Sequence, residues 1–304
     1  MAAPAVPPSR LAELGRMVAA GRLIPYLGPE VLTLGPEPAP VPTGARAFSH
    51  QLAGRVAVPG RIRNNLWHTA QYIETHRHRM TLDKLVAEAF REVPRPGPVH
   101  LWLAGLPDVP LIVDTWYDGT MAAALAGRPD TRWGWMQGAS EARRTGEAPW
   151  WRAHDGGGGE CAAAAAEDWA TLLYKPHGAA QPTGDVLVSD SDYVEVLTEI
   201  DIQTPIPDAV KERRLGRGFL FLGCRFYDQI LRNFARSILK YSAGPHYAVV
   251  PADDLTPNEI RFLDREGIIP LPVALPDAVA GLAADAAPVG EQCPRPGGPP
   301  CDPP

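Results

Sequence analysis

The sequence has only four cysteines, and no two of them form a C-x-x-C pair. A structural zinc site built on paired thiolates is therefore not expected. Prolines interrupt the first residues and no apolar segment follows them, so nothing near the N-terminus resembles a signal peptide. No apolar run is long enough to span a bilayer. These absences predict a cytoplasmic protein with reduced thiols and no membrane partner.

An excess of positive charge is also lacking, because the formal net charge is −6. A nucleic-acid partner is therefore not expected. The sequence contains neither a Gly-x-Ser-x-Gly elbow nor a Walker-type Gly-Lys-Ser/Thr loop. His68, His76 and His78 suggest a metal site, but the last two are two residues apart and would point to different sides of a helix. We expect a solvated polar face there and no metal site.

Strand-like and helical segments alternate along the chain. The strand-like runs are 22–27, 109–113, 171–174, 185–188, 218–222, 246–250 and 268–272, of which 109–113 is continuously apolar. Continuous apolar runs of this length are typical of strands buried on both faces of a parallel sheet. The pattern predicts an α/β fold with a Rossmann-like parallel sheet over residues 9–283, and an inserted helical sub-domain at about 45–98.

Two further segments depart from this alternation. Residues 127–168 are rich in tryptophan and glycine, and we expect an irregular insertion whose tryptophans cover an apolar surface. Residues 284–304 are rich in proline and glycine, and we expect a disordered tail.

Small or polar residues follow four of the predicted strands. They are Gly28-Pro-Glu30, Asp114-Thr-Trp-Tyr-Asp118, His177-Gly178 and Gly223-Cys-Arg225. The carboxyl ends of the strands in a doubly wound sheet line one crevice, where ligands bind. A glycine directly after the first strand lets the backbone approach a phosphate. The alternative for His177 is an ordinary histidine in a turn.

The order of these motifs resembles the bacterial sirtuin-like (silent-information-regulator-type) NAD-consuming family, in the branch without the zinc module. The resemblance covers roughly residues 10–275. It rests on Pro25-Tyr-Leu-Gly28, His100-Leu-Trp-Leu-Ala-Gly-Leu106, Thr115-Trp-Tyr-Asp118, Lys175-Pro-His-Gly178, Asp192-Tyr193 and Phe221-Leu-Gly223.

The resemblance implies that NAD, or an ADP-ribose-like nucleotide, lies across the crevice with its pyrophosphate near Gly28. His177 matches the family's general base for cleavage of the nicotinamide–ribose bond. Thr115 and Asp118 would hydrogen-bond the ribose or brace the loop. The binding residues expected from the resemblance are Gly28, Glu30, Thr115, Trp116, Asp118 and Gly223.

The chain departs from the family pattern at two positions. Trp116 stands where the family has an asparagine, and Pro29-Glu30 replaces Ala-Gly in the first loop. An indole donates one hydrogen bond and accepts none, so it cannot orient a water as a carboxamide does. Glu30 places negative charge near the expected pyrophosphate, and Pro29 lacks a backbone donor. Both changes point away from efficient NAD hydrolysis.

Two functional interpretations stay open. In the first, the protein binds NAD and is a weak or degenerate NAD hydrolase. In the second, it is a non-catalytic module that senses a nucleotide or binds a protein partner or its own copies, and Trp116 and the tryptophans of the insertion fill the old site. Protein deacylation is less expected, because the zinc module and its cysteine pairs are missing.

Overall fold

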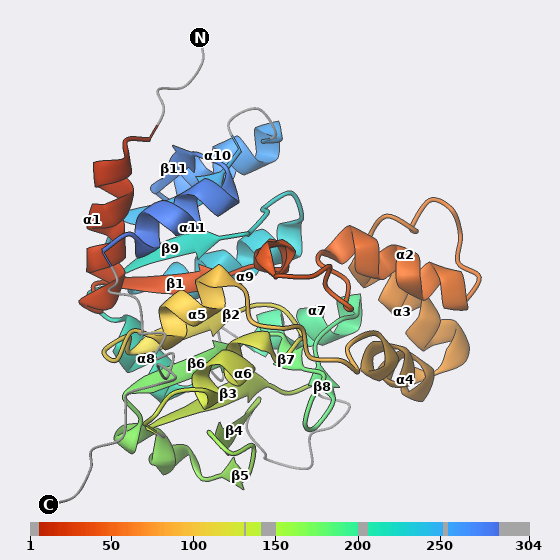
Figure 1. The fold of residues 1–304 in the computed structure, drawn as a ribbon. Coiled ribbons are helices and arrows are strands. Elements are labelled where there is room, and N and C mark those ends of the chain that lie inside the picture. The colour runs from red at the N-terminus through yellow and green to blue at the C-terminus, as the bar shows by residue number, and fades with distance from the viewer. Residues whose placement is uncertain (1–5, 131, 141–149, 200–205, 252–254, 286–304) are drawn as a thin grey trace, which may run out of the picture.

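A mixed nine-stranded sheet forms the centre of the described part of the chain in the computed structural model (Figure 1). The structure describes residues 6–130, 132–140, 150–199, 206–251 and 255–285. The strand order is β11 (Ile268–Pro272), β10 (His246–Val250), β9 (Gly218–Leu222), β1 (Leu23–Leu27), β2 (Leu111–Asp114), β6 (Thr171–Lys175), β3 (Trp133–Gly138), β4 (Trp151–Asp155) and β5 (Glu160–Cys161).

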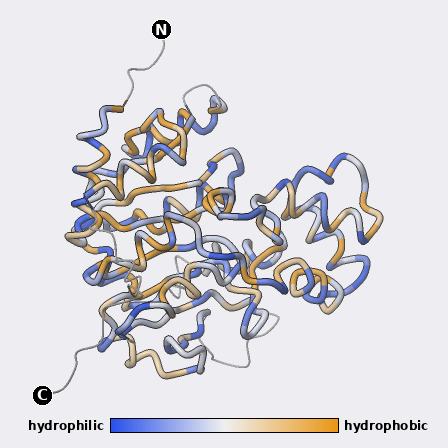
Figure 2. The backbone as a smooth tube through the Cα atoms, viewed as in Figure 1, coloured by the Kyte–Doolittle hydropathy of each residue, from blue (hydrophilic) through white to orange (hydrophobic). Residues whose placement is uncertain are grey.

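Strands β11 to β3 in this order pair in parallel, whereas β4 and β5 add antiparallel pairs at one edge. The predicted Rossmann-like α/β fold is confirmed. Successive side chains of a strand point to opposite faces, so both faces of the apolar central strands must be covered. Figure 2 shows these strands as largely hydrophobic along their length.

Helices cover both faces of the sheet. On one face, α1 (Pro8–Ala19), α5 (Pro98–Ala104), α6 (Thr120–Ala126) and α11 (Leu275–Ala283) pack against Leu23, Leu27 and other residues of the same strand phase. On the other face, α8 (Asp208–Arg214), α9 (Gln229–Leu239) and α10 (Pro257–Arg265) pack against Ile24, Tyr26 and their neighbours.

A helical block lies between β1 and β2 in the sequence and beside the sheet in space (Figure 1). It follows η1 (Pro29–Leu34) and contains α2 (Ala45–Arg55), α3 (Leu66–Arg77) and α4 (Arg79–Ala89). The block shares an apolar core with the chain near α7 (Asp190–Glu199). These three helices lie within the predicted range of about 45–98, whereas α5 begins at the end of that range and packs on the sheet.

The prediction of an irregular insertion over residues 127–168 is wrong, because the segment contains β3, β4, β5 and the short helix η3 (Ala163–Asp168). Gly134 lies within β3, and a β-carbon there would come within 2.3 Å of the Trp169 ring. This glycine makes room for a large ring, and glycine and tryptophan together hid the strand pattern. Residues 141–149 and the predicted disordered tail from 286 onward lie outside the described residues.

The run at 185–188 does not join the main sheet. Only β8 (Asp185–Val186) is a strand, and it pairs with β7 (Gly178–Ala179) in a separate two-stranded sheet. Within the described ranges, no helix combines the length and apolar character needed to cross a membrane. The same residues include no group of three or more metal-ligating side chains.

Candidate functional site

A pocket with an empty volume of about 610 Å³ lies where the carboxyl ends of β1, β2, β6 and β9 meet the helical block. The structure therefore brings together residues from all four predicted strand ends. The lining residues are Tyr26, Gly28, Pro29, Glu30, Gly44, Ala45, Trp67, Thr115, Trp116, Tyr117, His177, Tyr193, Cys224, Arg225, Phe226, Tyr227 and Leu231. Asp118 and Gly223, two of the predicted binding residues, are not among them.

His177 lines this pocket from the corner that follows β6. The next residue, Gly178, has a φ of +80°, and a β-carbon there would lie 2.0 Å from the carbonyl oxygen of Asp185. Only glycine fits this left-handed and crowded position. The tight corner that follows the histidine therefore depends on Gly178.

The two imidazole nitrogens of His177 have different surroundings. Nδ1 lies 3.2 Å from the Tyr193 hydroxyl, whereas Nε2 is buried and has no hydrogen-bond partner among the described residues. Burial, with a smaller contribution from the Lys175 ammonium, lowers the pKa of His177 to about 3. The imidazole is thus neutral near pH 7, and one of its nitrogens is left for a ligand.

Trp116 forms another part of the pocket wall. Its Nε1 donates a 2.7 Å hydrogen bond to the carbonyl oxygen of Pro42, and its ring packs against Phe48, Phe90 and Tyr117. This tryptophan therefore attaches the end of β2 to the loop and helix that begin the helical block. Its hydrogen-bond donor is already used within the fold.

The tryptophans of the 127–168 segment do not fill the pocket, which corrects that part of the second interpretation. Trp133 and Trp135 belong to β3 and lie in the core between the sheet and α5 and α6. Trp150 and Trp151 are also absent from the pocket lining. These tryptophans therefore leave the pocket open to a ligand.

Two glycines bring the ends of β1 and β9 close together. A β-carbon on Gly28 would lie 2.2 Å from the carbonyl oxygen of Gly223, and the backbone N–H of Glu30 donates to the same oxygen at 3.2 Å. Gly223 itself has a φ of +63°. Gly28 thus lines the pocket, whereas Gly223 shapes it from behind.

Charge of both signs borders the Gly28 end of the pocket. Glu30 and Arg225 both line it, and the Arg225 guanidinium donates to both carboxylate oxygens of Glu259, at 3.0 and 3.2 Å. Sequence reasoning placed Arg225 at a strand end but gave it no role. The pocket wall that carries Glu30 thus also carries a cation, and Glu259 is paired with that cation.

Thr115 and Asp118 both bond to the backbone. The Thr115 hydroxyl donates to the carbonyl oxygen of Leu27 at 2.8 Å, and the Asp118 carboxylate accepts from the N–H of Thr120 at 2.8 Å. These contacts brace the loop between β2 and α6. A contact between either residue and a ribose stays a prediction.

A buried ion pair connects the ends of β2 and β6 beneath the pocket. Lys175 Nζ lies 2.6 Å from Asp114 Oδ2, and Asp114 Oδ1 accepts from the backbone N–H of Trp116 at 3.1 Å. Burial raises the pKa of Asp114 to about 6, although Lys175 acts in the opposite direction. The pair links the strand that carries Trp116 to the strand that carries His177.

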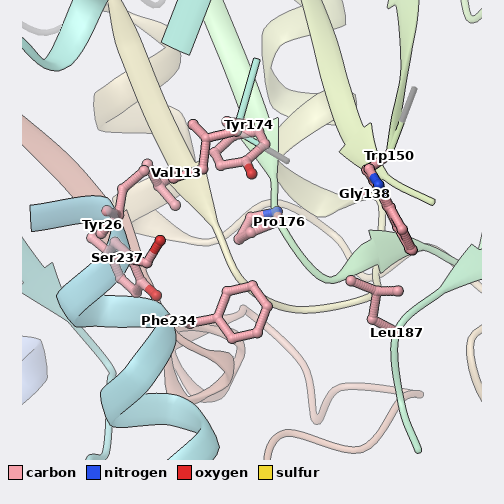
Figure 3. A pocket seen from close by; sticks show the side chains of 11 residues that line it. Tyr26, Val113, Gly138, Trp150, Tyr174, Pro176, Leu187, Phe234 and Ser237 are labelled. Atoms are coloured by element: carbon pink, nitrogen blue, oxygen red, sulfur yellow. The ribbon is translucent and has the colours of Figure 1, made fainter. Parts of the chain in front are cut away.

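A second pocket, of about 440 Å³ and mainly apolar, lies on the α9 side of the sheet (Figure 3). Phe234 of α9 lines it, and the centroid of its ring lies 4.4 Å from that of His177. Tyr26 lines both pockets, whereas His177 lines only the first. We therefore place the candidate site in the first pocket, with Phe234 behind the histidine.

Comparison with protein families gives a match to the SIR2-like domain over residues 110–271, which is more than half of the 304 residues. The match runs from β2 to β11 and includes Trp116, His177 and Tyr193. Gly28 and Glu30 lie before it. No curated protein matches the chain.

Proposed function

Because the chain belongs to the SIR2-like domain family, we propose that its pocket binds NAD or an ADP-ribose-like nucleotide. In this proposal, His177 Nε2 accepts a hydrogen bond from a ribose hydroxyl. The observation that carries it is the buried Nε2, which has no partner among the described residues while its imidazole lines a pocket at the strand ends. A buried polar atom without a partner is costly, so a ligand that supplies a donor gains from meeting it.

The pocket fits a nucleotide better at the His177 end than at the Gly28 end. Arg225 is a cation on the pocket wall that could face a phosphate, but it already pairs with Glu259. The N–H groups of Gly28 and Glu30 are bonded within the fold, to the carbonyl oxygens of Leu222 and Gly223. Pro29 has no N–H to donate, and Glu30 carries negative charge. We therefore propose that contacts at the ribose contribute more to affinity than contacts at the pyrophosphate.

We further propose that hydrolysis of the nicotinamide–ribose bond is slow. The bond to be cleaved belongs to NAD, the ligand that would occupy the pocket. His177 can accept a proton, but an imidazole with a pKa of about 3 is a weak base near neutral pH. The Trp116 indole has no acceptor and its donor is held by Pro42, so it cannot orient a water.

The second candidate is a non-catalytic nucleotide sensor, and the Trp116 contact favours it. The indole joins the pocket wall to the loop before α2, so an occupied pocket and the helical block share one structural element. A protein partner, or a second copy of the chain, would then bind the helical block differently when the pocket is occupied. Binding without turnover would support this candidate over slow hydrolysis.

Calorimetric titration of NAD and of ADP-ribose tests the binding proposal. We expect both nucleotides to bind, and His177→Phe to weaken binding about tenfold, because the ring is kept while the acceptor is lost. The matched control is His154→Phe. His154 is another buried imidazole, its nitrogens also have no partner among the described residues, and it stacks on Trp135 outside the pocket. Failure of both nucleotides to bind, or equal losses in the two variants, would contradict the proposal.

Release of nicotinamide separates the two candidates. We expect the wild-type protein to release nicotinamide slowly from NAD and His177→Phe to show no release above the uncatalysed rate. Wild-type protein that binds NAD but releases no nicotinamide is the result expected of the sensor.

A further inference from the structure

The hydrogen bond of His177 Nδ1 decides which nitrogen of the imidazole carries the proton. The partner is the hydroxyl of Tyr193, 3.2 Å away, and both side chains are buried. The same hydroxyl lies 2.8 Å from the carbonyl oxygen of Leu187. A neutral imidazole has one N–H and one lone pair, so the direction of this short chain of hydrogen bonds fixes the state of Nε2.

The geometry favours one direction. The Tyr193 hydroxyl has a single hydrogen, and the carbonyl of Leu187 can only accept. The contact to the carbonyl is the shorter of the two, at 2.8 Å against 3.2 Å, which favours the hydrogen on that side. The Tyr193 oxygen is then an acceptor for Nδ1–H, and Nε2 is left with its lone pair.

The surroundings of Tyr193 hold this arrangement in place. Its ring packs edge-on against Trp67 of α3, Phe234 of α9 and the His177 imidazole. These contacts come from three different parts of the chain, so the ring cannot turn away without disrupting the apolar core of the helical block.

The backbone that carries the Leu187 carbonyl is held as well. The Asp192 carboxylate accepts from the N–H groups of Val188 and Ser189, at 2.9 and 3.1 Å. Arg79 of α4 donates to Asp192 at 2.6 Å and to the carbonyl oxygen of Val186 at 2.9 Å. The helical block therefore fixes the loop on which the acceptor for Tyr193 lies.

We propose that Tyr193 is a positioning residue that holds His177 in the Nδ1–H tautomer and so keeps the lone pair on Nε2 for a ligand hydroxyl. The role in ligand binding rests on the proposed function, whereas the tautomer exists with or without a nucleotide. An Nε2–H tautomer would present a donor and could not accept a proton or a hydroxyl hydrogen.

Nitrogen NMR of the histidine side chains tests the proposal on the full chain without any ligand, because the two tautomers give different nitrogen shifts. Comparison with His177→Phe assigns the His177 signals. We expect wild-type His177 to be the Nδ1–H tautomer near pH 7. We expect Tyr193→Phe, which keeps the ring but removes the acceptor for Nδ1–H, to give a mixture of tautomers or the Nε2–H form.

The matched control is Tyr117→Phe. The Tyr117 hydroxyl also donates to the Leu187 carbonyl, at 2.9 Å, and it lies 3.4 Å from the Tyr193 hydroxyl, but it does not contact His177 directly. Each variant removes one hydroxyl from the same carbonyl and leaves the other tyrosine as its donor. We expect Tyr117→Phe to keep the wild-type tautomer.

Three results would overturn the proposal: an Nε2–H tautomer in the wild-type protein, an unchanged tautomer in Tyr193→Phe, or the same change in both variants. The first of these is read from the wild-type protein alone, so the test does not depend on the folding of a variant. If nucleotides bind, Tyr193→Phe should weaken binding at least about twofold, because half or less of the molecules would present the lone pair. If the tautomers behave as expected and no nucleotide binds, the proposed function fails and the role of Tyr193 in setting the tautomer stands.

Discussion

Trp116 and His177 lie in the same pocket at the ends of two adjacent parallel strands, but their polar atoms have opposite fates. The indole N–H of Trp116 is bonded to Pro42, and its ring belongs to an aromatic cluster with Phe48 and Phe90. The Nε2 of His177 is buried without a partner among the described residues. One strand end is therefore built into the fold, while the other keeps a buried nitrogen that no described residue satisfies.

This difference explains why a tryptophan at the end of β2 need not close the pocket. Trp116 is large, but its ring packs toward the helical block, and the pocket keeps an empty volume of about 610 Å³. At the position where the resemblance leads us to expect an asparagine, this chain has a residue that supports the fold. Changes at the two strand ends should therefore affect stability and nucleotide affinity to different degrees.

Breaking the ion pair between Asp114 and Lys175, which joins the strand ends that carry Trp116 and His177, should have the largest effect on stability. Lys175→Met leaves the Asp114 carboxylate buried without its partner, and we expect the free energy of unfolding to fall by about 3–5 kcal/mol. Urea unfolding measures this loss. The double variant Asp114→Asn with Lys175→Met removes the charge, keeps an oxygen for the Trp116 N–H and should recover most of the stability. If Lys175→Met is as stable as the wild type, the ion pair does not hold the ends of β2 and β6 together.

The pH dependence of stability should report the burial of His177. Its pKa is about 3 in the folded protein and has an ordinary value of 6.5, so the unfolded chain binds more protons between these values. The free energy of unfolding must therefore fall as the pH drops below 6.5. Between about pH 8 and about pH 5 we expect the wild type to lose about 2 kcal/mol more than His177→Phe.

Urea unfolding of both proteins at several pH values checks this difference. Other buried groups that titrate in the same range, such as Asp114 and His100, are present in both proteins, and their contributions cancel in the comparison. Parallel pH profiles for the two proteins would mean that the imidazole of His177 is hydrated. Its Nε2 would then have a partner, as the indole N–H of Trp116 does.

The strand ends could be predicted from the sequence, because apolar runs of strand length are local and parallel strands end at one edge of a sheet. Most of the partners at those ends could not. The Trp116 indole bonds to a carbonyl 74 residues earlier, and Tyr193 reaches His177 from 16 residues later. Only the Asp192-Tyr193 motif indicated that the latter residue mattered. The strand β3 was missed because Gly134 is explained by Trp169, a contact that no local pattern contains.

Trp116→Phe should have the smallest effect on stability. It should also separate the role of Trp116 in the fold from the role of His177 in binding. The phenyl ring keeps much of the packing, but the Pro42 carbonyl loses its donor in a buried place, so we expect a loss of about 1–1.5 kcal/mol in the free energy of unfolding. The affinity for NAD should change less than twofold, because the indole N–H is not available to a ligand. Urea unfolding and calorimetric titration of the same preparation measure the two quantities. A tenfold loss of affinity with unchanged stability would show that the indole N–H binds the nucleotide. Trp116 and His177 would then both belong to the binding site.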